Sequence, residues 1–116
     1  MTFYVYILAS QKNGTLYTGS TQDVEVRVWE HKNKVQEGFT AKYGVNKLVW
    51  YEGHATREGA FVRERQIKKW NRAWKIELIE AENPDWRDIW AEWFSEPDRD
   101  WSVWRPKKPG SPLSRG

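Results

Sequence analysis

The amino-acid sequence predicts an α/β fold: a small three-stranded, mainly antiparallel sheet flanked by helices, followed by an extra Trp-rich helix. Three observations lead to this prediction. Residues 3–8 form an unbroken run of aromatic, β-branched and aliphatic side chains, which is typical of a strand buried on both faces. Asn13-Gly14 follows as a hairpin turn, because this dipeptide tolerates the positive φ angles of tight turns. Helical spacing of apolar residues then recurs in later stretches of the chain.

A chain of 116 residues is long enough for one domain with its own core. We expect this domain to span residues 1–94, with the extra helix at about residues 84–94. Residues 95–116 contain most of the prolines of the chain, and we expect them to form a partly disordered tail.

Two further strands complete the predicted sheet. Residues 15–19 should run back antiparallel beside the first strand, so that Tyr6 and Tyr17 lie on neighbouring strands. Residues 47–51 are again β-branched and aromatic, and we expect the third strand there. The connecting residues 33–46 should form a loop.

The first helix is expected from about Gln22 to Lys34. Ser20 and Asp23 provide the helix-start pattern of a hydroxyl residue followed three positions later by an acid. The apolar side of this helix is marked by Val24, Val28 and Val35. Arg27 and His31 are four positions apart, so they are neighbours on another side of the helix. We expect these two side chains to form one functional edge.

A second helix is expected to begin after its cap, Thr56, and to end at about Lys69. Its apolar stripe comprises Ala60, Phe61 and Ile67. Glu64 lies on the same stripe, where a carboxylate is costly unless it is paired or binds a metal ion. Glu64 is therefore either the partner of a basic neighbour in a salt bridge or the ligand of a metal ion.

Asn71 is expected to cap a third helix that ends at about Ile79, with Trp74 and Leu78 facing the core. Basic side chains around this helix and in the preceding loop suit contacts with phosphate groups. The candidates for nucleic-acid binding are Lys42, Lys68, Arg72 and Lys75. For each of them the alternative is an ordinary solvated charge.

Asn83-Pro84-Asp85 has the features of a helix start: a cap, a proline at the first position and an acid in the first turn. The apolar residues that follow at helical spacing are Trp86, Ile89, Trp90, Trp93 and Phe94. This stripe should pack on the sheet or on the third helix. The alternative is a weak homodimer through the Trp86–Trp93 helix of an otherwise monomeric protein.

Composition narrows the function classes. Residues 1–80 hold 13 Lys and Arg against 9 Asp and Glu, a basic surplus that favours a polyanionic partner such as nucleic acid. The absence of cysteine excludes disulfides and thiolate metal sites and fits a reducing compartment. With no basic-then-apolar leader and no long apolar run, we expect a cytoplasmic protein without a membrane span.

Four parts of the sequence together resemble the GIY-YIG nuclease superfamily. They are Val5-Tyr6-Ile7, then Tyr17-Thr18-Gly19, then Arg27 with His31, and finally Glu64 inside a later helix. The first two parts differ from Gly-Ile-Tyr and Tyr-Ile-Gly, but both keep the tyrosine. The chain is most similar to the small single-domain bacterial branch, over about residues 2–79.

The resemblance implies a metal-dependent endonuclease that hydrolyses phosphodiester bonds in DNA, whether branched, otherwise structured or single-stranded. Its catalytic residues would be Tyr6, Tyr17, Arg27, His31 and Glu64. Glu64 would hold one divalent ion, Mg²⁺ or Mn²⁺, since such hard ions prefer oxygen ligands. Arg27 would bind the scissile phosphate through its two-pronged guanidinium.

The resemblance also implies that Tyr17 activates the attacking water and that Tyr6 positions this water or assists proton transfer. A free tyrosine titrates near pH 10, so a tyrosine base needs help from a cationic neighbour. His31 would then be a proton shuttle or a hydrogen-bond partner of Tyr17. The alternative for both tyrosines is core packing, which is how most strand tyrosines behave.

A second function remains open: a nucleic-acid-binding module on the same fold that does not cleave, or that cleaves only with a partner. It is suggested by the lack of a separate DNA-targeting domain in so short a chain. We expect DNA rather than RNA as the partner, although no residue distinguishes the two.

Overall fold

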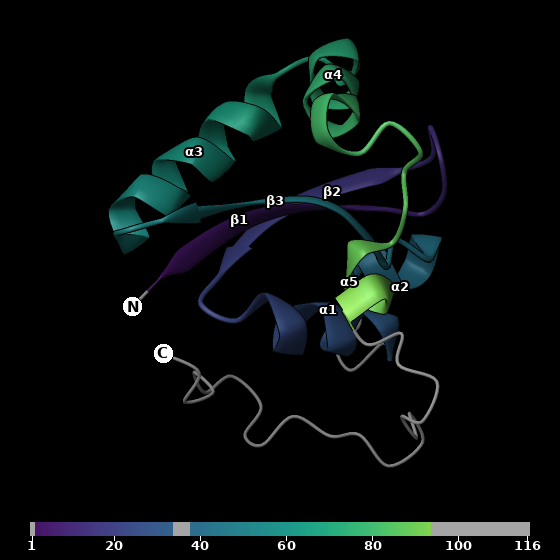
Figure 1. The fold of residues 1–116 in the computed structure, drawn as a ribbon, viewed down its shortest axis with the longest axis horizontal. Helices are drawn as coiled ribbons and strands as arrows, with labels where there is room; N and C mark the ends of the chain where they lie inside the picture. Colours follow the sequence, from purple (N-terminus) through teal and green to yellow (C-terminus); the bar gives the residue numbers. More distant parts are fainter. Residues whose placement is uncertain (1, 34–37, 94–116) are drawn as a thin grey trace.

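A computed structural model describes residues 2–33 and 38–93 of the chain (Figure 1). The elements, in chain order, are β1 (Phe3–Ala9), β2 (Leu16–Thr21), α1 (Val24–Lys32), α2 (Phe39–Tyr43), β3 (Lys47–His54), α3 (Arg57–Lys69), α4 (Arg72–Glu82) and α5 (Ile89–Trp93). The three strands form one antiparallel sheet in the order β2-β1-β3. The predicted fold class is therefore confirmed. None of the helices in the described part of the chain has the length and apolar character needed to cross a membrane.

The hairpin between β1 and β2 forms as predicted. Asn13 has a φ of 59°, which the Asn-Gly turn accommodates without the strain that a bulkier residue would suffer. The register places Tyr6 opposite Gly19 and Leu8 opposite Tyr17. Tyr6 and Tyr17 therefore lie diagonally on the same face of neighbouring strands.

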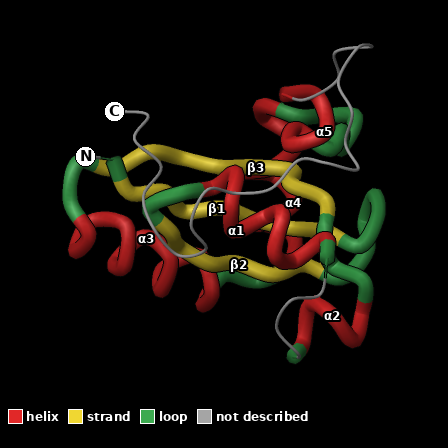
Figure 2. Tube along the Cα trace, turned by 90° about the horizontal axis from the view of Figure 1, so that it is seen from below, coloured by secondary structure: helices red, strands yellow, loops and turns green. Residues whose placement is uncertain are grey.

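Helices cover both faces of the sheet, with α3 and α4 on one face and α1, α2 and α5 on the other (Figure 1). Side chains of β1 alternate between the two cores, as the pleat requires. Val5 and Ile7 join the core under α3 and α4, whereas Tyr6 and Leu8 join the core under α1 and α5. Figure 2 shows α1 crossing its face of the sheet and α5 lying beside β3. Burial of β1 on both faces explains its continuous apolar sequence.

The predicted bounds of the first helix and of the loop after it need correction. The N-cap of α1 is Asp23, whose carboxylate accepts a hydrogen bond from the Val26 amide at 3.2 Å, so the helix starts at Val24 and not at Gln22. Between residues 33 and 46, where we expected only a loop, α2 forms a short helix that ends at Gly44 with a φ of 65°. Lys34 and Val35, the predicted end of the first helix, lie outside the described residues.

The third helix is capped by Asn71 as predicted, because its side chain accepts a hydrogen bond from the Trp74 amide at 2.9 Å. The helix extends to Glu82, three residues beyond Ile79. The prediction that Trp74 faces the core is wrong: this residue is 55% exposed and packs edge-on against Trp70. Leu78 does pack against the core, although it is only partly buried.

The predicted helix start at Asn83-Pro84-Asp85 is wrong. Asn83 is fully buried, and its amide donates to the backbone oxygens of Val49 and Arg87, which ties this turn to β3. Trp86 then adopts a φ of 55°, which a helix cannot contain, so α5 begins only at Ile89. Phe94 and the predicted tail lie outside the described residues.

The Trp-rich segment packs mainly inside its own chain. Trp86 and Trp90 are 4% and 8% exposed, and the Trp90 indole donates to the backbone oxygen of Glu25 on α1. Trp93 contacts the ring of Tyr51 on β3 and is 37% exposed. The two buried tryptophans therefore serve the core of the chain and not a dimer surface.

Candidate functional site

The site is built around Gly19, on the edge strand β2. A Cβ atom added at Gly19 would lie 2.6 Å from the Tyr6 Oη, 2.8 Å from its Cζ and 3.0 Å from the Tyr17 Cε2. The Tyr6 phenol therefore reaches from the central strand across the backbone of β2, and it can do so only because residue 19 has no side chain. Glycine is required at this position because the Tyr6 side chain approaches the backbone of β2 closely, and not because the chain turns there.

His31 on α1 holds the Tyr6 phenol. Its Nε2 lies 3.3 Å from the Tyr6 Oη, and its Nδ1 lies 2.8 Å from the Thr40 Oγ1 on α2. The ring also contacts Tyr17, with ring centroids 5.5 Å apart. The hydrogen bond from His31 to Tyr17 was one of the two roles expected for His31; the imidazole is instead hydrogen-bonded to Tyr6, and Thr40 on α2 takes part in fixing it.

The surroundings of the Tyr6 phenol and the His31 imidazole keep both side chains neutral. Burial, together with the nearby charge of Arg27, lowers the pKa of His31 from 6.5 to about 4. Burial raises the pKa of the Tyr6 phenol far above its usual range; Tyr17 and Glu64 raise it further, and Arg27 opposes them. Tyr6 therefore keeps its proton and can donate it to a neutral imidazole. Because the charges of Arg27 and Glu64 both affect the pKa of Tyr6, these two side chains lie close enough to interact with it electrostatically.

Arg27 lies at the solvent side of this group. Its side chain is 37% exposed, and the guanidinium lies 3.6 Å from the carboxylate of Glu30, one turn further along α1. A separation of 3.6 Å is long for an ion pair, and the Arg27 end of it reaches solvent, although the Glu30 side chain is only 13% exposed. The guanidinium can therefore exchange this partner for a phosphate group.

Glu64 approaches the same edge strand from the opposite face of the sheet. Ser20 lies opposite Val5, whose side chain packs in the core under α3 and α4, and the Ser20 hydroxyl donates to the Glu64 Oε1 at 2.6 Å. The Glu64 Oε2 lies 2.6 Å from the Lys68 Nζ. The site thus straddles the edge strand β2: four predicted residues lie on the α1 face, and Glu64 comes from α3.

The predicted inward orientation of Glu64 is confirmed only in part. Its side chain is 14% exposed, whereas Phe61 on the predicted apolar stripe is 51% exposed. The salt bridge to a basic neighbour, one of the two alternatives for Glu64, is present. In residues 2–33 and 38–93, three or more His, Cys, Asp or Glu side chains nowhere gather as a metal-binding group. A metal ion at Glu64 would therefore rely on one carboxylate, water and substrate oxygens.

The four predicted nucleic-acid-binding residues differ in their surroundings. Burial and the charges of Arg72 and Lys68 lower the pKa of Lys75, so these three form one basic cluster beside the end of α3. Arg72 is also engaged structurally, because its guanidinium donates to the backbone oxygens of Asn13 and Gly14 in the hairpin turn. Lys42 lies apart on α2, over the ring of Tyr43.

Sequence reasoning missed two polar residues of the site. Ser20 belongs to the pattern of a helix start, and Thr40 lies in residues that the sequence predicts to be a loop. Neither assignment could reveal that these hydroxyls meet Glu64 and His31, because both contacts are between separate elements. The available signal was the strand register, since a residue next to Gly19 must point to the opposite face from Tyr6.

The lowered pKa of His31 predicts a specific dependence of stability on pH. The folded protein binds this proton only near pH 4, whereas the unfolded chain binds it near pH 6.5, so the contribution of His31 is complete above 6.5 and is lost as the pH falls toward 4. In urea titrations at pH values from 6.5 down to 4, the free energy of unfolding of His31→Gln should decrease less than that of the parent. His54→Gln, which removes the other histidine of the chain, is the control. An equal loss in the parent and in His31→Gln would contradict this prediction.

The chain is similar to several known proteins. Residues 2–77 match the model of the GIY-YIG catalytic domain. A UPF0213 protein of Clostridium perfringens is 39% identical over 80 residues, covering 69% of this chain and 85% of the relative. A UPF0213 protein of Syntrophus aciditrophicus is 42% identical over 83 residues, covering 71% and 93%.

Among solved structures, the solution NMR structure of a UPF0213 protein of Bacillus halodurans is similar to this chain. The identity is 30%, the coverage is 77% of this chain and 94% of that chain, and the TM-score is 0.48. The family match spans β1 to α4 and includes both tyrosines, Arg27, His31 and Glu64. The chain therefore belongs to the GIY-YIG family of nucleases, in its small single-domain UPF0213 branch.

Proposed function

We propose that this protein is a metal-dependent endonuclease that hydrolyses phosphodiester bonds in DNA. The observation that carries the proposal is the convergence of Tyr6, Tyr17, Arg27 and His31 with Glu64 around the side-chain-free position Gly19. A structural role alone does not explain this arrangement. Core packing does not require a phenol to cross the backbone of the neighbouring strand at a position without a side chain.

Glu64 fits a single hard divalent ion such as Mg²⁺ or Mn²⁺. Its carboxylate already faces one cation, the ammonium of Lys68, and the Ser20 hydroxyl fixes the orientation of the other oxygen. Lys68 is 49% exposed on a flexible stem, so it can leave when a divalent ion arrives. Glu64 would hold such an ion together with water and phosphate oxygens, and the ion would supply neutralisation of charge on the phosphoryl oxygens.

The remaining residues have separate roles in hydrolysis of the phosphodiester. Arg27 binds the scissile phosphate and stabilises the charge that grows on its oxygens. Tyr17, on the edge strand, activates the attacking water. Tyr6 stays protonated, so it does not compete as the base; it orients the water while its own position is fixed by neutral His31. Thr40 in turn fixes the imidazole, so that α2 supports the site from outside.

The proposal is tested by incubating the protein with branched, nicked and single-stranded DNA, and with matching RNA, in Mg²⁺, in Mn²⁺ and in EDTA. We expect cleavage of DNA that requires the divalent ion and is lost in Glu64→Ala. Absence of cleavage of every substrate, or equal cleavage by Glu64→Ala, would refute the mechanism.

The ion pair between Glu64 and Lys68 leads to a second prediction. Lys68→Met keeps the aliphatic stem but removes the ammonium that competes for the Glu64 carboxylate. Without nucleic acid present, we expect Lys68→Met to bind Mn²⁺ at least about fivefold more tightly than the parent does, because a positive charge near the carboxylate is removed. Electron paramagnetic resonance of free Mn²⁺ measures this affinity. Lys69→Met is the matched control, and an unchanged affinity in Lys68→Met would contradict the prediction.

A second candidate function is a nucleic-acid-binding module that does not cleave. The same ion pair favours it, since a lysine can replace a metal ion permanently at a carboxylate. This function predicts salt-dependent binding to DNA that survives Glu64→Ala, with no cleavage by the parent in either divalent ion.

A further inference from the structure

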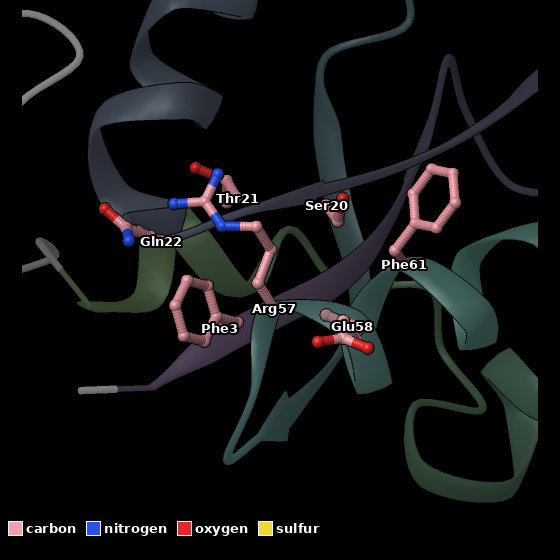
Figure 3. A pocket seen from close by; sticks show the side chains of 8 residues that line it. Phe3, Ser20, Thr21, Gln22, Arg57, Glu58 and Phe61 are labelled. Atoms are coloured by element: carbon pink, nitrogen blue, oxygen red, sulfur yellow. The ribbon is translucent and has the colours of Figure 1, made fainter.

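A pocket lies next to the Glu64 site, between the start of β1, the end of β2 and the first two turns of α3. Its volume is about 340 Å³, at the small end of the range for ligand-binding pockets. Figure 3 shows the rings of Phe3 and Phe61 on opposite sides, with Ser20 between them and the Arg57 guanidinium reaching toward Thr21. Ser20 lines this pocket and also donates a hydrogen bond to Glu64, so the pocket lies directly beside the proposed catalytic carboxylate.

The pocket combines aromatic and cationic groups. The Arg57 guanidinium, which lines the pocket, lies 5.5 Å from the centre of the Phe3 ring. Arg65 does not line the pocket, but its guanidinium lies 5.4 Å from the centre of the Phe61 ring. Phe61 is 51% exposed, although a phenyl ring on a core helix is normally buried. Glu58 adds one carboxylate to the lining, which can accept hydrogen bonds from an amino group.

These groups form one line along α3. Arg57, Phe61, Glu64 and Lys68 are spaced at i, i+4, i+7 and i+11, so they follow one side of the helix over about 16 Å. The order is cation, aromatic ring, carboxylate, cation. The aromatic ring thus lies between a cation and the carboxylate site on one side of the helix, and a cation beside an exposed ring suits a phosphate and the base attached to it.

We propose that this pocket binds the base of the nucleotide next to the scissile phosphate, stacked against Phe61 beside the Arg57 guanidinium. The inference rests on the proposed function, because it takes the phosphodiester at Glu64 as the point of attachment. A base can enter the pocket only when it is unpaired and turned out of its stack. The pocket therefore selects substrates with an unpaired nucleotide at the cleavage site.

The test separates base contacts from phosphate contacts and does not need cleavage. Fluorescence anisotropy in EDTA measures binding of a short, labelled single-stranded DNA and of the same strand with every base removed. We expect Phe61→Ala to weaken binding of the base-bearing strand about tenfold, which is within the range for one base stacked on an aromatic ring. Parent and variant should bind the abasic strand equally. Phe61→Tyr should retain binding, and Val62→Ala, the exposed neighbour on α3, is the control.

The outcomes distinguish the two proposals. Equal binding of the base-bearing strand by parent and Phe61→Ala, or an equal loss on the abasic strand, would overturn the base pocket, even if the parent cleaves DNA in Mg²⁺. A base-dependent loss in a protein that cleaves nothing would support the pocket and refute only the nuclease activity. Failure of the parent to bind either strand would overturn the base pocket, whereas the nuclease activity is decided by cleavage in Mg²⁺ and Mn²⁺.

Discussion

Glu64→Gln should reduce DNA cleavage by about a thousandfold or more while leaving binding of DNA in EDTA nearly unchanged. The amide oxygen of glutamine can still accept the hydrogen bond from Ser20, so the side chain keeps its place. It loses the negative charge that would hold a divalent ion and that pairs with Lys68. Loss of one group that stabilises transition-state charge costs ~10²–10³ in rate, and loss of the metal ligand should cost at least as much.

Single-turnover cleavage and anisotropy of the same labelled DNA measure the two effects. Glu77→Gln is the matched control, because this residue is an exposed glutamate on α4. Equal loss of binding and cleavage in Glu64→Gln would mean that Glu64 supports the fold or the binding surface and not the chemistry. Cleavage at the parent rate would remove Glu64 from the mechanism altogether.

Gly19→Ala should both destabilise the protein and abolish cleavage. The new methyl group would lie 2.6 Å from the Tyr6 Oη and 2.8 Å from its Cζ, so the buried phenol must move. Overpacking of this kind costs ~1–3 kcal/mol. Since each kcal/mol lowers Tm by ~4–8 °C in a domain of this size, we expect Tm to fall by roughly 5–20 °C.

Two variants show whether the effect comes from the phenol. Gly53→Ala is the control, because its methyl group would lie 3.2 Å from the Thr2 Cγ2 and 3.6 Å from the Tyr4 Cε1, without the contacts below 3.0 Å that occur at Gly19. In the double variant Gly19→Ala with Tyr6→Phe the nearest clashing atom is absent, so part of the lost Tm should return while cleavage stays abolished. A Tm for Gly19→Ala equal to that of the parent would show that the phenol has room elsewhere.

The sequence predicted those parts of the fold that depend on local chemistry. The β1–β2 hairpin follows from Asn13-Gly14, and α3 and α4 begin after the caps that were predicted from Thr56 and Asn71. The errors occur where a distant contact decides the structure. Asn83 resembles a helix cap, but its amide binds the backbone of β3, and the chain turns before α5 begins.

The candidate site was predictable to a similar extent. The hairpin predicted that the two tyrosines lie on neighbouring strands, and the four-residue spacing predicted that Arg27 and His31 are neighbours on one helix. That these two pairs lie together was implied by the resemblance to the GIY-YIG nucleases. The partners of these residues were not predictable, because Ser20 and Thr40 meet them from other elements. The Lys68 partner of Glu64 is four positions away on the same helix, and it was predicted only as a basic neighbour in general.

The most direct measurement is anomalous diffraction from crystals of the full chain soaked with Mn²⁺. The account predicts a single strong peak beside the Glu64 carboxylate at the edge strand β2, with the Lys68 ammonium turned away. A carboxylate still bound to Lys68 at saturating Mn²⁺, with no peak beside it, would contradict the account.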